Sequence, residues 1–260
     1  MFNTKQFFSL FLVIFIVLAG ITSVTAESLP PETKTKLDNY YQQAWNHLKQ
    51  MHKDVKNLDL AHGLYKKALE LSPEYSETYW KLAEICFKKA QAAKDKDQSE
   101  KLYRQAMEHA ETSLEKNPKS IGGLYWTGTC EAQLADIAGV FKAMKLVKKA
   151  KKHLKQCIDL DPSSRFANLS RVILAILYTE APWPIRDLGE AEKLMDKAVE
   201  LDPNLTLASV KRAKTLIKKG KKELAIKELQ RGLKIQNPTY VWDSELYDWP
   251  EAKALLAELK

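Results

Sequence analysis

Apolar residues recur every three or four positions along most of the chain, the spacing that places them on one face of an α-helix. The clearest stripe consists of Ala191, Leu194, Met195, Ala198 and Val199. Such stripes end at a proline in five segments: ALELSP (68–73), SLEKNP (113–118), CIDLDP (157–162), AVELDP (198–203) and GLKIQNP (232–238). Because proline cannot continue a helix and pushes the preceding residue out of the helical conformation, each segment predicts a helix end followed by a turn.

Small side chains occupy the same place in each of these helices. Alignment on the prolines, with one extra residue before the last, puts five alanines in one column: Ala61, Ala106, Ala150, Ala191 and Ala225. Seven residues later the column is small again: Ala68, Ser113, Cys157, Ala198 and Gly232. A position restricted to small side chains indicates that two helices cross closely there. We therefore predict that each of these helices is the buried second helix of a helical hairpin.

The spacing of the repeats predicts the fold class. The prolines are 45, 44, 41 and 35 residues apart, against a period of about 34 for the tetratricopeptide (TPR) hairpin. We predict an all-α, TPR-like α-solenoid of about five helical hairpins plus a C-terminal capping helix that begins at Trp249. Extra residues are expected around 94–98, around 139–145 and at 180–184, where two prolines flank Trp183 and predict a rigid edge loop.

The N-terminal segment has the parts of a secretory signal peptide. Lys5 is basic, residues 7–20 are apolar, and Val24-Thr25-Ala26 fits a cleavage site. We expect residues 1–26 to be cleaved, leaving residues 27–260 as one helical-repeat domain in a periplasmic or otherwise extracytoplasmic compartment. Retention of the apolar run as a membrane anchor is the alternative. Ile21 stands where a lipid-bearing cysteine would follow Gly20, so we expect membrane association to be only indirect.

The chain has a formal net charge of +8, and much of its positive charge lies in two lysine-rich segments. The first contains Lys142, Lys145, Lys148, Lys149, Lys151, Lys152 and Lys155, and the second contains Lys214, Lys218, Lys219, Lys221 and Lys222. In the first, Lys142, Lys145, Lys149 and Lys152 share a helical face that could attract an acidic protein surface or anionic lipid. A solvated face is the simpler interpretation. No nucleic-acid-binding motif accompanies these segments, so we do not expect a nucleic-acid partner.

The sequence contains few residues that would support catalysis or metal binding. Cys86, Cys130 and Cys157 each lie in an apolar helical pattern, which favours buried thiols over disulfides. The five histidines form no H-E-x-x-H motif and no local cluster with cysteine, and glycine-rich phosphate loops are missing. We therefore expect no metal and no cofactor.

The repeat pattern also predicts where a binding site would lie. The first helices of TPR hairpins line the concave surface of the solenoid. Candidate groove residues on these helices are Trp80, Glu84, Phe87, Tyr125, Thr129, Gln133, Leu169, Ile173, Ile176, Val210 and Lys214. A mostly apolar groove with a few charges suits a protein segment or an amphipathic small organic molecule. Leu169, Ile173 and Ile176 would instead be core residues if the edge loop around Trp183 covers them.

An enzyme is not expected. Glu84 and Lys214 could in principle act as acid and base, but no nucleophile or metal accompanies them.

From about residue 74 the chain resembles the T-component of tripartite ATP-independent periplasmic (TRAP) transporters, a family of exported helical-repeat proteins. The resemblance is carried by GLYW (123–126), CIDLDP, the apolar helix 172–178, APWPIRDLGEAEKLMDKAVELDP (181–203) and WPEAKALLAEL (249–259). It implies an accessory role in organic-acid transport, in which the protein docks a periplasmic solute-binding protein or its ligand. A general exported TPR scaffold for envelope protein complexes is the alternative. Homo-oligomerisation is left open by the sequence.

Overall fold

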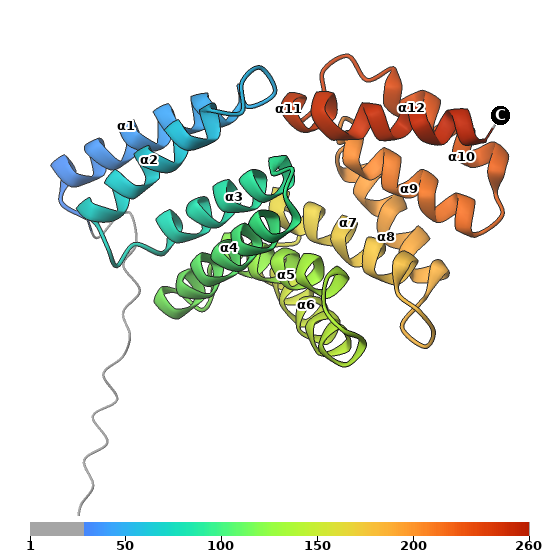
Figure 1. The fold of residues 1–260 in the computed structure, drawn as a ribbon, viewed down its shortest axis with the longest axis horizontal. Coiled ribbons are helices and arrows are strands. Elements are labelled where there is room, and N and C mark those ends of the chain that lie inside the picture. The colour runs from blue at the N-terminus through green and yellow to red at the C-terminus, as the bar shows by residue number, and fades with distance from the viewer. Residues whose placement is uncertain (1–28, 260) are drawn as a thin grey trace, which may run out of the picture.

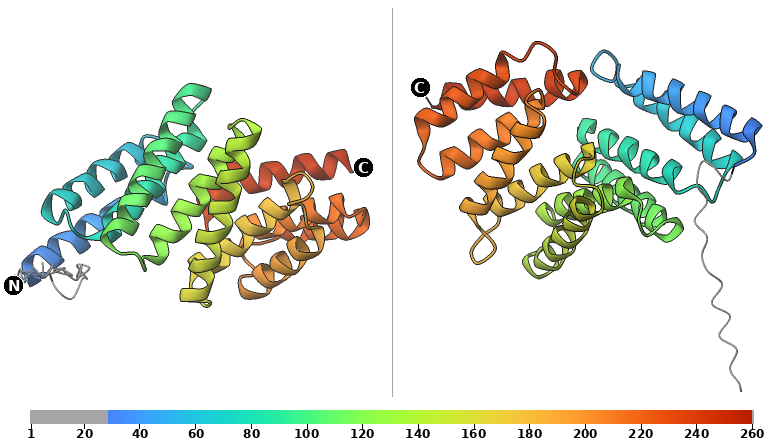
Figure 2. Two further views of the ribbon diagram at one scale, coloured as in Figure 1. Left: turned by 90° about the horizontal axis from the view of Figure 1, so that it is seen from below. Right: turned by 180° about the vertical axis from the view of Figure 1, so that it is seen from behind.

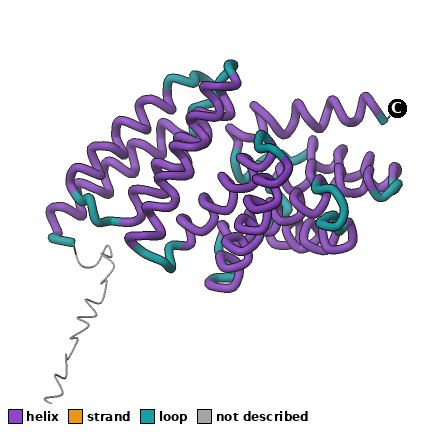
Figure 3. Tube along the Cα trace, turned by 60° about the horizontal axis from the view of Figure 1, so that its bottom comes forward, coloured by secondary structure: helices purple, strands orange, loops and turns teal. Residues whose placement is uncertain are grey.

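The computed structural model describes residues 29–259, and most of this part is helical, with short connecting loops (Figures 1 and 3). The hairpins are α1 (Pro31–Leu48) with α2 (Asn57–Leu71), α3 (Ser76–Ala92) with α4 (Lys96–Lys116), α5 (Ile121–Asp136) with α6 (Val140–Leu160), α7 (Arg165–Glu180) with α8 (Leu188–Leu201), and α9 (Thr206–Lys218) with α10 (Lys222–Leu233). The described part ends with α11 (Val241–Asp243), the π-helical turn η2 (Ser244–Asp248) and α12 (Trp249–Glu258). The predicted solenoid of about five hairpins and a capping helix is confirmed. The predicted signal peptide, residues 1–26, lies outside the described residues.

The hairpins are arranged in two layers. Each first helix packs against the first helix of the next repeat, in the order α3, α5, α7 and α9. Each second helix packs on its own first helix and on the first helix that follows. The first helices therefore form the inner layer of a curved array, and the second helices form the outer layer (Figure 1).

The alanine column marks the closest contacts between these layers, as the sequence indicates. Ala61, Ala106, Ala150, Ala191 and Ala225 have no solvent exposure. Glycines on facing helices show how little space remains. A Cβ atom on Gly128 of α5 would lie 2.7 Å from Cγ of Leu154 on α6, and one on Gly232 of α10 would lie 2.5 Å from Oγ of Ser209 on α9. Larger side chains would push the helices apart at these crossings.

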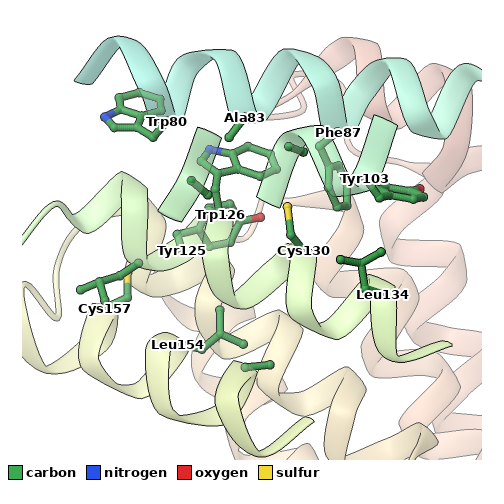
Figure 4. Close-up of a cluster of buried hydrophobic side chains, with 14 of the residues drawn as sticks. Trp80, Ala83, Phe87, Tyr103, Tyr125, Trp126, Cys130, Leu134, Leu154 and Cys157 are labelled. Atoms are coloured by element: carbon green, nitrogen blue, oxygen red, sulfur yellow. The ribbon is translucent and has the colours of Figure 1, made fainter. Parts of the chain in front are cut away.

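The largest buried cluster joins the second, third and fourth hairpins (Figure 4). Phe87 of α3 contacts Trp126 of α5, with ring centroids 5.3 Å apart. The predicted buried thiols are confirmed, and burial raises the pKa of Cys86 and of Cys157 to about 11. These thiols are therefore protonated core groups at neutral pH.

The extra residues fall where the sequence places them. Helices α4 and α6 are each 21 residues long, so the first two insertions extend the starts of second helices. The third insertion forms the loop between α7 and α8, in which Trp183 is 87% exposed. No helix within residues 29–259 combines the length and the apolar composition needed to cross a membrane.

The C-terminal segment has a second role that the repeat pattern does not reveal. Leu255, Leu256 and Leu259 pack on the α9–α10 hairpin, as expected for a capping helix. The segment before α12 runs back to the first hairpin, so that α11 lies near the turn between α1 and α2 (Figures 1 and 2). Trp242 of α11 meets Trp45 of α1 edge to face, with ring centroids 5.3 Å apart. This contact joins the two ends of the solenoid.

Replacing Ala150 by leucine tests the helix crossings. Because the side chain has no free volume around it, we expect the free energy of unfolding to fall by about 1–3 kcal/mol, measured by chemical denaturation. Lys155→Leu, at an exposed position of the same helix, is the control and should change stability by less than about 0.5 kcal/mol. Equal effects of the two substitutions would contradict the close crossing.

Candidate functional site

The concave side of the solenoid encloses a cavity of about 590 Å³. Its wall combines residues of α3, α5, α7 and α9 with the first turns of α6, the loop after α7, and the C-terminal segment 240–251. Because the C-terminal segment reaches α1 and α3, it bounds a groove that the inner helices alone would leave open. A volume of this size accommodates a drug-sized molecule or a few side chains of a partner protein.

One half of the cavity is mostly apolar. The apolar part of its wall is formed by residues of α6, α7 and the edge loop, namely Val140, Ala143, Met144, Val147, Ile173, Ile176, Pro182 and Ile185. Asp136 and Glu180, the last residues of α5 and α7, line the cavity as well. The α6 residues reach the cavity because this helix begins earlier than a regular second helix would. This half can desolvate an apolar group of a ligand.

The other half carries charges among aromatic rings. Glu84 of α3 and Arg165 of α7 both line the cavity, and neither side chain makes a hydrogen bond or ion pair with any residue in the described range 29–259. Burial raises the pKa of Glu84, opposed by the positive charge of Arg165. The Arg165 guanidinium lies 4.6 Å from the ring centroid of Phe166. Both groups are therefore free to meet polar groups of a ligand.

An ion pair holds the C-terminal segment beside this polar half. Nζ of Lys88 on α3 donates to Oδ1 of Asp243 on α11 at 2.6 Å, and both residues line the cavity. Burial lowers the pKa of Lys88, but the Asp243 carboxylate outweighs this effect, so the pKa is raised and the lysine stays charged.

Asp248 of η2 is a buried carboxyl group in the same region. Its side chain accepts a hydrogen bond from Oγ1 of Thr206 at 2.6 Å, and the residue is 3% exposed. Burial raises the pKa of Asp248 to about 7, and the negative charge of Asp243 contributes to this increase. The Thr206 hydrogen bond and the positive charges of Lys211 and Lys88 act in the opposite direction and lower the pKa. The group therefore gains its charge near neutral pH.

The structure brings together most of the groove candidates from the sequence. The residues that line the cavity are Glu84, Phe87, Tyr125, Thr129, Gln133, Leu169 and Ile173. Ile176 lines the cavity as well. Trp183 points into solvent and does not cover the α7 side chains Leu169, Ile173 and Ile176. The edge loop instead contributes Pro182 and Ile185 to the cavity wall.

Three other candidates lie elsewhere. Trp80 is buried in the core, where its ring packs against the space left by Gly122 of α5. Val210 is buried in the cluster between α9 and α10. Lys214 lies outside the main cavity, and its Nζ donates to Oε1 of Glu251 at 3.1 Å.

Sequence reasoning missed two groups of cavity residues. Arg165 and Phe166 begin a first helix, and the predicted stripe on that helix starts at Leu169. The second group belongs to the C-terminal segment and consists of Tyr240, Trp242 and Asp243. This segment contacts α1 and α3, which lie more than a hundred residues earlier in the sequence. The aromatic residues around Trp242 in the sequence indicate that this segment packs against another element. They do not indicate that the element is α1.

The histidines and acidic residues of the described part of the chain do not form a metal site. Nδ1 of His153 lies 2.7 Å from Oε2 of Glu131. Within residues 29–259, no group of three or more His, Cys, Asp or Glu side chains is placed to hold a metal ion.

Comparison with solved structures defines the class of the protein. The fold is similar to that of TTC0263, a thermophilic TPR protein from Thermus thermophilus, with a TM-score of 0.63, 16% identity, and coverage of 86% of this chain and 98% of that one. It is also similar to pilF of Pseudomonas aeruginosa, with a TM-score of 0.57, 15% identity, and coverage of 88% and 90%. The chain thus has the fold of a TPR-like helical-repeat protein.

Comparison of sequences defines the family. The family model "Regulator of microtubule dynamics protein 1-3" matches residues 40–260, and the chain belongs to this family. The curated relatives include Regulator of microtubule dynamics protein 1 of Pongo abelii, 25% identical over 161 residues that cover 55% of this chain and 51% of the relative. The human protein of the same name is 26% identical over 112 residues, which cover 43% and 36%. The matched region thus spans about half or less of the length of these relatives.

The Lys88–Asp243 pair yields a stability prediction. Asp243→Ala leaves the Lys88 ammonium buried without a partner, and we expect a loss of about 3 kcal/mol in the free energy of unfolding. The double substitution Lys88→Met/Asp243→Leu removes both charges and should recover most of this loss. Chemical denaturation of the two variants measures the difference, and a double variant as unstable as the single one would contradict a desolvated pair.

Asp248 yields a pH prediction. The pKa of Asp248 is higher in the folded state than in the unfolded chain, so the folded state holds the proton more tightly. The stability that protonated Asp248 contributes is therefore fully present below the unfolded pKa of about 3.9 and is lost as pH rises through the folded pKa of about 7. The wild type should therefore lose stability relative to Asp248→Asn between about pH 5 and pH 8, by on the order of 2 kcal/mol. Thermal or chemical unfolding of both proteins across this range measures the difference. A constant difference would show that Asp248 titrates normally.

Proposed function

We propose that the chain is a non-enzymatic interaction protein that holds a segment of a partner protein in its concave cavity. The observation that carries this proposal is the cavity wall, which is mostly apolar at the α6 end and charged at the Glu84–Arg165 end. An extended or helical segment with an apolar side chain and adjacent polar groups would match both halves. A small amphipathic organic molecule is the alternative occupant of the same space.

The chemistry of the wall supports binding over catalysis. Glu84 is the carboxyl group best placed to take up a proton, but Lys214, the base or acid considered with it, lies outside the cavity and is bound to Glu251. The thiols are buried and protonated, so none is a nucleophile.

Two identities of the partner are open to test. The name of the relatives associates them with microtubule dynamics, and we propose a partner from that process for this chain as well. The second candidate is a periplasmic solute-binding protein of a TRAP transporter. The segment 181–203, which carries the resemblance to the T-component, and the apolar run at 7–20 support this second proposal. This second proposal requires that residues 1–26 act as an export signal and that the chain binds a solute-binding protein outside the cytoplasm. The alternative, a general exported scaffold, requires the export signal but no solute-binding protein.

A charge in the apolar half tests the proposed use of the cavity. We expect Ile173→Glu to weaken binding of the partner at least about tenfold, because the glutamate would be desolvated against an apolar group. The control is Leu224→Glu on the outer helix α10, where leucine is 50% exposed, and it should leave binding unchanged.

The partner is identified first by photo-crosslinking. A photoreactive amino acid replaces Ile173 in one protein and Leu224 in another, and adducts specific to position 173 are identified by mass spectrometry. Affinity is then measured with the purified partner. Recovery of the same adducts at both positions, or equal affinities of Ile173→Glu and Leu224→Glu, would contradict binding in the cavity. A solute-binding protein or a microtubule-associated protein among the adducts distinguishes the two identities.

A further inference from the structure

The two lysine-rich segments, alike in sequence, differ in how their charges are compensated. In the segment around α9 and α10, Lys218 pairs with Glu180, and Lys219 and Lys221 both pair with Glu192. The lysines of α6 form no ion pair with any residue in the range 29–259. Helix α6 contains seven lysines and one aspartate, Asp159, and so carries six of the eight net positive charges of the chain. The excess positive charge is therefore a property of one helix.

The start of this helix is apolar as well as exposed. Ile137 in the preceding turn is 51% exposed, Val140 74%, Phe141 85% and Met144 50%. A side chain such as Phe141 gains nothing from this position in the isolated protein, because most of its surface remains in water. The first turns of α6 thus combine a protruding apolar tip with lysines directly along the helix.

The neighbouring loop adds a second exposed aromatic residue. The turn between α5 and α6 and the loop between α7 and α8 lie side by side at one edge of the molecule (Figures 1 and 2). Val140 and Met144 of the tip and Pro182 and Ile185 of the loop line the same end of the cavity. Trp183, in that loop, projects into solvent. The apolar edge therefore borders the cavity.

We propose that this edge, consisting of the α6 tip, Trp183 and the lysine face of α6, docks on the surface of a membrane that contains anionic phospholipids. Lysines attract such a surface, and exposed Phe and Trp side chains enter its interfacial region. An acidic protein could also attract the lysines, but it would need a pocket for each protruding side chain. A lipid interface receives them without a preformed shape.

The acidic groups that face this edge do not cancel its charge. Asp136 and Glu180 lie beside the tip, and Glu180 is already bound to Lys218. Burial raises the pKa of Asp136, with a further contribution from Glu180. Glu111 of α4 faces Lys149, and Glu131 is bound to His153. The remaining lysines of the α6 face are free to meet lipid phosphates.

A fluorophore placed at the tip tests the proposal in the full chain. Phe141→Cys is labelled with a thiol-reactive dye whose emission shifts to the blue in lipid, while the three native thiols are buried. We expect a blue shift with vesicles that contain phosphatidylglycerol and little change with vesicles of phosphatidylcholine alone. The same dye at Lys67→Cys, on the exposed side of α2, should not respond, which separates docking of this edge from any membrane binding by the N-terminal apolar run.

Charge variants give the quantitative test. In the labelled protein, Lys142→Gln/Lys145→Gln/Lys149→Gln should raise the lipid concentration for half-maximal response on the order of a hundredfold at low salt. The matched control Lys222→Gln/Lys227→Gln/Lys234→Gln makes the same change in net charge at exposed lysines elsewhere and should respond like the parent. An equal response to both kinds of vesicle, or equal effects of the two triple variants, would overturn the proposal. No response to either vesicle would also overturn it.

Discussion

The structure depends on the close crossing of helices at small side chains. Where Ala61, Ala150 or Ala225 lies, a neighbouring helix approaches so closely that a methyl group fills the space. Each hairpin therefore packs on the next at a fixed separation, and repetition of this contact bends the array. The inner helices then present one side of every repeat to the same concave space, which is why residues from four hairpins can line one cavity.

The C-terminal segment changes what this concave surface can do. An open solenoid offers a groove to any extended ligand that reaches it. Here the Trp242–Trp45 contact and the Lys88–Asp243 pair connect the last element to the first hairpin and to α3. The groove becomes a bounded cavity, and a ligand must meet the aromatic and charged groups of this segment as well as the inner helices.

The sequence predicted what is local and periodic, and it could not predict what depends on distant contacts. The alanine column and the prolines define the hairpins because helix packing and helix ends are set within a repeat. The candidates Glu84, Tyr125 and Ile173 follow from the same periodicity and do line the cavity. Trp80 occupies an equivalent place on its helix but fills the space that Gly122 leaves, a detail that depends on the facing helix. The return of Trp242 to α1 has no periodic signal.

The closure of the solenoid by its C-terminal segment can be tested by measuring the distance between the first hairpin and the C-terminal helix in solution. Spin labels at Lys53→Cys, in the turn after α1, and Lys253→Cys, on α12, would report it by double electron–electron resonance. If the two ends are joined, the measured distances form one narrow distribution that agrees with the structure. A broad distribution, or one centred at a clearly longer distance, would show that the ends are not joined and that the concave surface is an open groove.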